Sequence, residues 1–198
     1  MRFLLLALIP VVAFGVWQHH KRVENEQRLV TVASAIAQRS VGVSCPSFWQ
    51  TLVDVRGDDG SVDFDVAGRP SDEAKLSESM CDRLADFAGA KTKPRFDCLT
   101  PDDRACNRKV VATARAMSTL AHEAYHLAGV RGEAAAECYA VQTVDFVAER
   151  LGASADQGRM VAVWAERTSA KTHPEEYHSP ECRAGGALDL RPRSPLWP

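Results

Sequence analysis

The sequence predicts a mainly α-helical protein of the α+β class: a helical bundle with one small β-hairpin and an irregular C-terminal strap pinned by a disulfide. Three observations predict this class. Apolar residues recur at helical spacing through most of residues 77–171, apolar and polar residues alternate around one Gly-rich turn, and residues 172–198 are rich in Pro and Gly. The chain has 198 residues, 45% of them hydrophobic, which predicts a single domain over residues 41–198.

Residues 1–22 are typical of an export signal. An apolar run at residues 3–17 follows Arg2, and Lys21 and Arg22 come soon after it. The run is shorter than the roughly 20 residues that span a bilayer, yet it could also remain uncleaved as a single N-terminal membrane anchor. A cleaved signal and an anchor both stay open. Either predicts an extracytoplasmic protein, secreted or anchored to the membrane.

Charge and cysteine content narrow the function classes further. The net charge of −2 gives no basic surplus, so we expect no nucleic-acid partner, and oligomeric state is not indicated. The six cysteines are well spread and contain no Cys-x-x-Cys pair, which favours disulfides in an oxidising compartment over a zinc ribbon. The pairs we expect, among others that are formally open, are Cys45 with Cys81, Cys98 with Cys106, and Cys138 with Cys182.

The first half of the chain predicts short elements. Residues 23–40 have a helical period and are expected to form a helical linker that packs on the domain or joins it to a membrane. Residues 51–56 and 61–66 alternate on either side of Gly57–Gly60, which predicts a hairpin. This hairpin could hold an extended substrate, or it could be purely structural. Gly68–Asp72 is expected to be a turn, and Ser77 to cap a short helix.

Three longer helices are expected to follow. Thr100-Pro101-Asp102-Asp103 has the features of a helix start, with Thr as N-cap and acids in the first turn. This helix is predicted to run to Gly129. A second helix is expected from about Gly132 to Gly152, and Ser154 is expected to start a third.

Two histidines on the first of these helices carry the strongest chemical signal. His122 and His126 are four residues apart, so on a helix they lie on one face with Cβ atoms roughly 5–6 Å apart, close enough to bind one metal ion. Glu123 lies about 100° around the helix from His122. That direction suits contact with a water on the metal better than contact with the metal itself. The pattern therefore indicates a metal site with Glu123 as general base.

Two carboxylates follow as candidates for a third ligand. Gly129 tolerates positive φ and can end the helix in a reversal. Glu133 and Glu137 then lie four residues apart, on one face of the next helix, which the reversal would turn towards the histidines. From the spacing alone, either carboxylate could complete the site.

This stretch, residues 118–140, resembles the zincin metallopeptidases, and among them the gluzincins. In several gluzincin families the second helix reads Glu-x-x-Ala-Asp-x-x-Ala, and Glu133 and Glu137 fall at its two acidic positions. The resemblance implies a zincin-type active-site helix and Zn²⁺ bound by His122, His126 and Glu133. Glu137 would then support a ligating histidine, although the two glutamates could be exchanged.

The sequence departs from the known zincin patterns at two positions, and the strap offers candidates for one further zincin role. Only six residues separate His126 from Glu133, which is shorter than in most gluzincins, and Gly132 stands where metzincins have a third histidine. Zincins often use a Tyr or His outside the motif as an oxyanion donor. Tyr177 or His178 of the strap could take this role, or could simply lie on the surface.

The sequence leaves three functions open. The first is an extracytoplasmic zinc-dependent peptidase that hydrolyses peptide or protein substrates through a zinc-bound water, with Glu123 as base. The second is a non-catalytic binding or structural protein with a structural or vestigial metal site, which a fourth ligand such as Glu137 would favour. The third is an intact site that the strap holds inactive.

Overall fold

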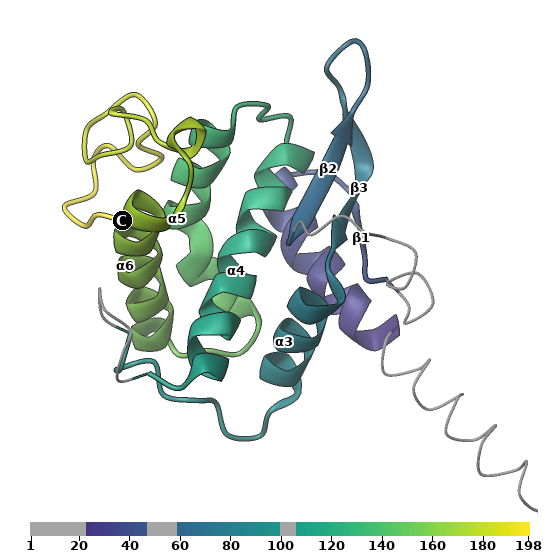
Figure 1. Cartoon of the computed structure of the whole chain (residues 1–198), viewed down its shortest axis with the longest axis vertical. Coiled ribbons are helices and arrows are strands. Elements are labelled where there is room, and N and C mark those ends of the chain that lie inside the picture. Colours follow the sequence, from purple (N-terminus) through teal and green to yellow (C-terminus); the bar gives the residue numbers. More distant parts are fainter. Residues whose placement is uncertain (1–22, 47–58, 100–105) are drawn as a thin grey trace, which may run out of the picture.

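The computed structural model describes residues 23–46, 59–99 and 106–198. These residues form a mainly helical domain with a small three-stranded sheet, as the sequence predicts (Figure 1). Helix α4 (Arg108–Leu127) lies in the centre, with α5 (Glu133–Arg150) and α6 (Ala155–Thr172) on one side and the sheet on the other. Helix α3 (Glu78–Gly89) packs against the lower part of α4. The central helix is therefore held between the helical layer and the sheet.

The predicted signal segment, residues 1–22, lies outside the described residues. Residues 23–37 are helical and place Leu29, Val32 and Ala33 in the core, so this segment packs on the domain. Within the part of the chain that the structure describes, no helix has both the length and the apolar character needed to cross a membrane.

Helix α4 begins later than the sequence predicts. The expected N-cap, Thr100, lies outside the described residues, and the helix starts at Arg108. Asn107 has extended backbone angles and its side chain accepts a hydrogen bond from the Lys109 backbone N–H at 2.9 Å. A helix that continues from Thr100 to Gly129 is therefore wrong. Asn107 replaces Thr100 as the N-cap, since Asn caps helices at least as well as Thr. Cys106, just before it, is not helical and forms a disulfide with Cys98.

The ends of the other helices follow local signals. Ser77 caps α3 by accepting a hydrogen bond from the Met80 backbone N–H. Gly152 has φ +100° between α5 and α6. Ser154 and Gln157 then form a capping box at the start of α6, where each side chain bonds the other's backbone N–H. The N-caps at Ser77 and Ser154 therefore confirm the predicted starts of these two helices.

The structure contains a β-hairpin, and its first strand overlaps the predicted strand at residues 61–66. Strand β2 (Gly60–Phe64) pairs antiparallel with β3 (Pro70–Leu76), and β1 (Gly42–Ser44) pairs parallel with β3, so the sheet order is β1-β3-β2. Gly60, which is predicted to lie in the turn, begins β2 instead, and residues 57 and 58 of that predicted turn lie outside the described residues. The predicted turn at Gly68–Asp72 is wrong at residues 70–72, which belong to β3. The predicted partner strand, residues 51–56, lies outside the described residues.

The chain turns at residues 65–69 for identifiable reasons. The Asp65 carboxylate accepts hydrogen bonds from the backbone N–H groups of Ala67 and Arg69, both at 2.9 Å, and Gly68 has φ +76°. These bonds and the Arg69 side chain lower the pKa of Asp65. Pro70 follows as the first residue of β3, a strand position that tolerates the missing N–H.

Three disulfides fasten the irregular parts of the domain. Cys45 pairs with Cys81, Cys98 with Cys106, and Cys138 with Cys182, which are the expected pairs. The last of them joins α5 to the strap, which contains the short 3₁₀ helix η1 (Glu175–Tyr177) and is otherwise irregular.

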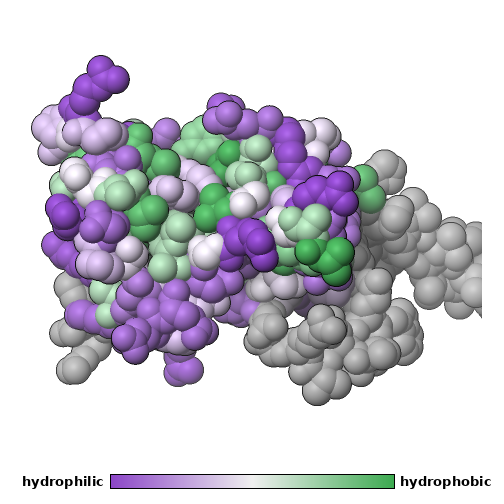
Figure 2. Space-filling view, turned by 90° about the horizontal axis from the view of Figure 1, so that it is seen from above, coloured by the Kyte–Doolittle hydropathy of each residue, from purple (hydrophilic) through white to green (hydrophobic). Residues whose placement is uncertain are grey.

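The end of the molecule that carries the hairpin and the strap mixes hydrophilic and hydrophobic residues without one continuous apolar area (Figure 2).

Candidate metal centre

Helix α4 supplies three side chains of the candidate site. His122, Glu123 and His126 are all buried, with 7%, 5% and 5% of their surface exposed. The helix around them is rich in Ala, which favours helix and leaves space beside the histidines. Ala121 and Ala124 are fully buried and occupy little volume. The site therefore lies at the edge of the core, beside the cavity that the sheet and α6 enclose.

The turn between α4 and α5 brings an acidic side chain of α5 to the two histidines. Gly129 has φ +95°, and the Val130 N–H donates to the Tyr125 carbonyl at 3.0 Å, so the chain reverses within a few residues. The Val130 carbonyl accepts a hydrogen bond from Nδ1 of His126 at 2.7 Å. One short turn thus places Glu133 at the start of α5 and orients the His126 ring.

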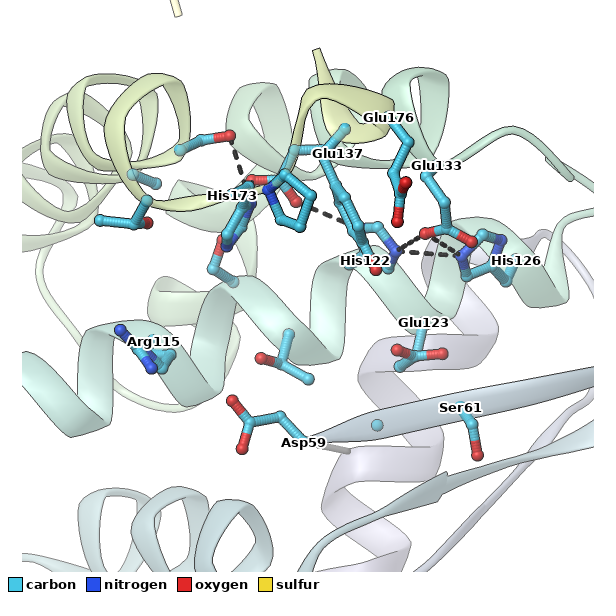
Figure 3. A pocket seen from close by; sticks show the side chains of 18 of the residues that line it. Asp59, Ser61, Arg115, His122, Glu123, His126, Glu133, Glu137, His173 and Glu176 are labelled. Atoms are coloured by element: carbon cyan, nitrogen blue, oxygen red, sulfur yellow. Dashed lines mark hydrogen bonds and ion pairs between the residues drawn. The ribbon is translucent and has the colours of Figure 1, made fainter. Parts of the chain in front are cut away.

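Three potential ligand atoms converge at the centre of the site (Figure 3). Nε2 of His122 lies 2.9 Å from Nε2 of His126, and Oε2 of Glu133 lies 3.0 Å from the first and 3.3 Å from the second. In a tetrahedral zinc site with bonds of about 2.0–2.1 Å, ligand atoms are roughly 3.3 Å apart. The three side chains are therefore close enough to share one metal ion.

The hydrogen bonds behind the histidines favour the same conclusion. Nδ1 of His126 faces the Val130 carbonyl, and Nδ1 of His122 faces Oε2 of Glu137 at 3.1 Å. In the neutral tautomer that these contacts favour, each Nδ1 carries the proton and each Nε2 keeps its lone pair. Two imidazole lone pairs and a carboxylate oxygen face one point, which is the donor set that a divalent cation requires.

Glu137 lies behind His122 rather than in the cluster. Its two oxygens bridge two histidines: Oε2 meets His122, and Oε1 meets Nδ1 of His173 at 3.1 Å. Burial alone would raise the pKa of Glu137, but the hydrogen bonds from His122 and His173 outweigh burial and lower the pKa well below its usual range. A carboxylate that stays ionised here fixes the tautomer and the orientation of His122.

Replacing Glu137 with Gln should weaken metal binding at this cluster by about 10–100-fold, because the neutral amide holds His122 less firmly and makes its Nε2 a poorer electron-pair donor to the metal. Competition with a fluorescent zinc chelator measures the change. Glu175→Gln is the matched control, because Glu175 is exposed and does not line the cavity. Equal zinc affinity in the two variants would mean that Glu137 only fills space beside the ring.

His122 is surrounded by negative charge. Burial disfavours the charged ring, but the hydrogen bond to Glu137 and the charges of Glu123, Glu137 and Glu133 outweigh burial and raise the pKa of His122. The same carboxylates favour any cation that binds at Nε2. The negative charge around His122 and the spacing of the ligand atoms therefore both favour a bound cation at this cluster.

The two strap residues that are candidates for an oxyanion donor, Tyr177 and His178, differ in their positions. Tyr177 lines the cavity, stacks on the His122 ring with centroids 5.6 Å apart, and hydrogen-bonds Glu133. Burial and the charge of Glu133 raise the pKa of Tyr177 to about 12, so its phenol stays protonated. His178 is exposed and is not among the residues that line this cavity.

His173 and Arg115 also line the cavity, although the sequence predicts no role for either of them. His173 directly follows the last residue of α6. Its contact with Glu137 arises from the packing of α6 on α5, so no local sequence pattern could have predicted it. Arg115 carries a local signal: it precedes His122 by seven residues and therefore lies on the same helix face.

The cavity has a volume of about 590 Å³ and is bounded by α4, α5, α6, β2 and η1. Strand β2 comes very close to α4 here, because a Cβ added to Gly60 would lie 2.8 Å from Cγ and from Oε1 of Glu123. Figure 3 shows Glu123 between the strand and the ligand cluster. Glu123 is thus next to the candidate metal position without being one of the three converging side chains.

No family model, curated protein or solved structure matches this chain.

Proposed function

We propose that the protein is an extracytoplasmic zinc-dependent peptidase, in which His122, His126 and Glu133 bind the zinc and Glu123 is the general base. The observation that carries this proposal is the convergence of two Nε2 atoms and one Oε2 atom within 3.3 Å of one another, beside a buried glutamate. The three disulfides indicate an oxidising, extracytoplasmic environment.

The residues around the cluster suit peptide hydrolysis. Zinc, when bound, acidifies water to a pKa of about 7 and polarises a carbonyl group. Glu123 can accept the proton of the attacking water and return it to the leaving amine. Tyr177 can donate a hydrogen bond to an oxygen that gains negative charge, since its raised pKa keeps the phenol protonated.

The number of converging ligands favours catalysis over a purely structural site. A structural zinc site is usually closed by four protein ligands, whereas a catalytic site keeps one position open. Within the described residues, the cluster that could hold a metal has three members. Glu137, the candidate fourth ligand, faces Nδ1 of His122, on the other side of the ring from the cluster.

The proposal is tested by peptide cleavage. Zinc-loaded protein incubated with a mixed peptide library should create new peptide termini, which mass spectrometry detects, and a chelator should stop their appearance. Zinc-loaded protein that cleaves nothing in such a library would contradict the proposal.

Strand β2 is the natural place for an extended substrate. It is an edge strand among the described strands, it lines the cavity, and it runs beside Glu123. An extended peptide can add to such an edge through backbone hydrogen bonds, which would hold a scissile carbonyl near the metal.

Gly60→Ala should reduce hydrolysis by roughly 10–100-fold while zinc stays bound, because the new Cβ forces Glu123 to move. The measurement is kcat/KM on a cleaved library peptide, together with zinc content. Gly89→Ala is the matched control, since a Cβ there meets nothing within 4 Å. Unchanged kcat/KM in Gly60→Ala would show that the position of Glu123 is not critical.

A further inference from the structure

A second cavity adjoins the candidate metal centre. It also has a volume of about 590 Å³ and lies between α3 and the first turns of α4. Asp59 and Arg115 line both cavities, so the two meet at these residues. In Figure 3, Arg115 and Asp59 lie at one end of the metal-centre cavity and His126 lies at the other.

The two cavities differ in charge. The metal-centre cavity contains several glutamates, whereas four cationic side chains line the second cavity and Asp59 is the one carboxylate among its described lining residues. In the part of the chain that the structure describes, none of the four cations forms an ion pair. The four are Arg83 on α3 and Arg108, Lys109 and Arg115 on α4.

The helix fixes the distance between the cations and the reaction centre. Arg115 precedes His122 by seven residues, so it lies on the same face, roughly 10 Å along the axis. Ser118 and Thr119 line the cavity between them. An extended peptide covers about 3.3 Å per residue, so about three of its residues span this distance.

We infer that this second cavity is a specificity site that binds a carboxylate of the peptide substrate, about three residues from the bond that is cleaved. The inference rests on the proposed peptidase function. Arginine side chains bind carboxylates through paired, charge-assisted hydrogen bonds, and Arg83 and Arg115 come from different helices, so they can grip one carboxylate from two sides. The carboxylate can belong to an acidic side chain or to the C-terminus of the peptide.

The test uses two randomised decapeptide libraries, one with amidated and one with free C-termini, and the zinc-loaded full chain. Cleavage sites are mapped by mass spectrometry for the wild type, for the double variant Arg83→Gln/Arg115→Gln, and for Arg159→Gln. Arg159 is an exposed arginine of α6 that lines neither cavity, so it controls for loss of charge. The same libraries are passed over immobilised Glu123→Gln protein, with and without the double substitution, to measure binding without cleavage.

We expect cleaved peptides to be enriched about tenfold or more in Asp and Glu near the third position from the cut, or in free C-termini at that distance. The enrichment should disappear in the double variant and persist in Arg159→Gln. Cleavage without enrichment, or enrichment that survives the double substitution, would overturn the inference and leave the peptidase function standing. Absence of cleavage, with acidic peptides still retained through Arg83 and Arg115, would sink the peptidase function but not the carboxylate site. Absence of both would sink both.

Discussion

Glu123→Gln should reduce peptide hydrolysis by about 10²–10⁴-fold and leave zinc bound. The amide has nearly the same shape as the carboxylate but cannot accept a proton from water, and a positioned general base contributes about that factor. Because Glu123 is not among the three converging side chains, its replacement should leave the ligand atoms in place. The rate of peptide cleavage and the zinc content, measured on the same preparation, check both halves of this prediction.

Glu149→Gln provides the matched control for this experiment. Glu149 is exposed near the C-terminal end of α5, so the substitution makes the same change of charge outside the cavity. Its cleavage rate should equal that of the wild type. A Glu123→Gln protein that still cleaves at the wild-type rate would remove Glu123 from the mechanism.

His126→Ala should weaken zinc binding by roughly a thousandfold. Structural zinc sites in zinc-finger peptides have binding free energies of about 10–16 kcal/mol, and on that scale the loss of one of three protein ligands removes about a third of the binding free energy. His126 also accounts for one of the two Nε2 atoms that face Glu133. Competition with chelators of graded affinity measures the change.

His178→Ala is the corresponding control, because His178 is exposed on the strap and does not line the cavity. Its zinc affinity should match that of the wild type. If His126→Ala and the wild type bind zinc equally well, the ion is held elsewhere in the chain.

The parts of the site that the sequence predicts correctly are those set by local periodicity. His122 and His126 come together because they are one helical turn apart, and a glycine-led reversal with i, i+4 spacing brings Glu133 and Glu137 to the same region. Spacing alone could not separate the roles of the two glutamates. Their difference arises from the crossing of α5 over α4, which directs Glu133 at both Nε2 atoms and Glu137 at Nδ1 of His122.

The parts that the sequence does not predict depend on contacts between distant segments. His173 reaches Glu137 because the C-terminus of α6 lies beside α5, and no periodicity encodes that contact. The turn between β2 and β3 is not predicted at its true place, because it depends on hydrogen bonds to the Asp65 side chain and on the positive φ of Gly68. The expected start of α4 fails for a similar reason, since Asn107 competes as a cap close to the Cys98–Cys106 disulfide.

The most direct test of the metal centre is the metal content of the purified wild-type protein, measured by elemental analysis after dialysis against zinc-containing and then metal-free buffer, beside Glu133→Ala. The account predicts one zinc ion per wild-type chain and much less in the variant, because Glu133 is the third converging ligand. A wild-type protein that retains no metal, or a variant that retains as much zinc as the wild type, would contradict it.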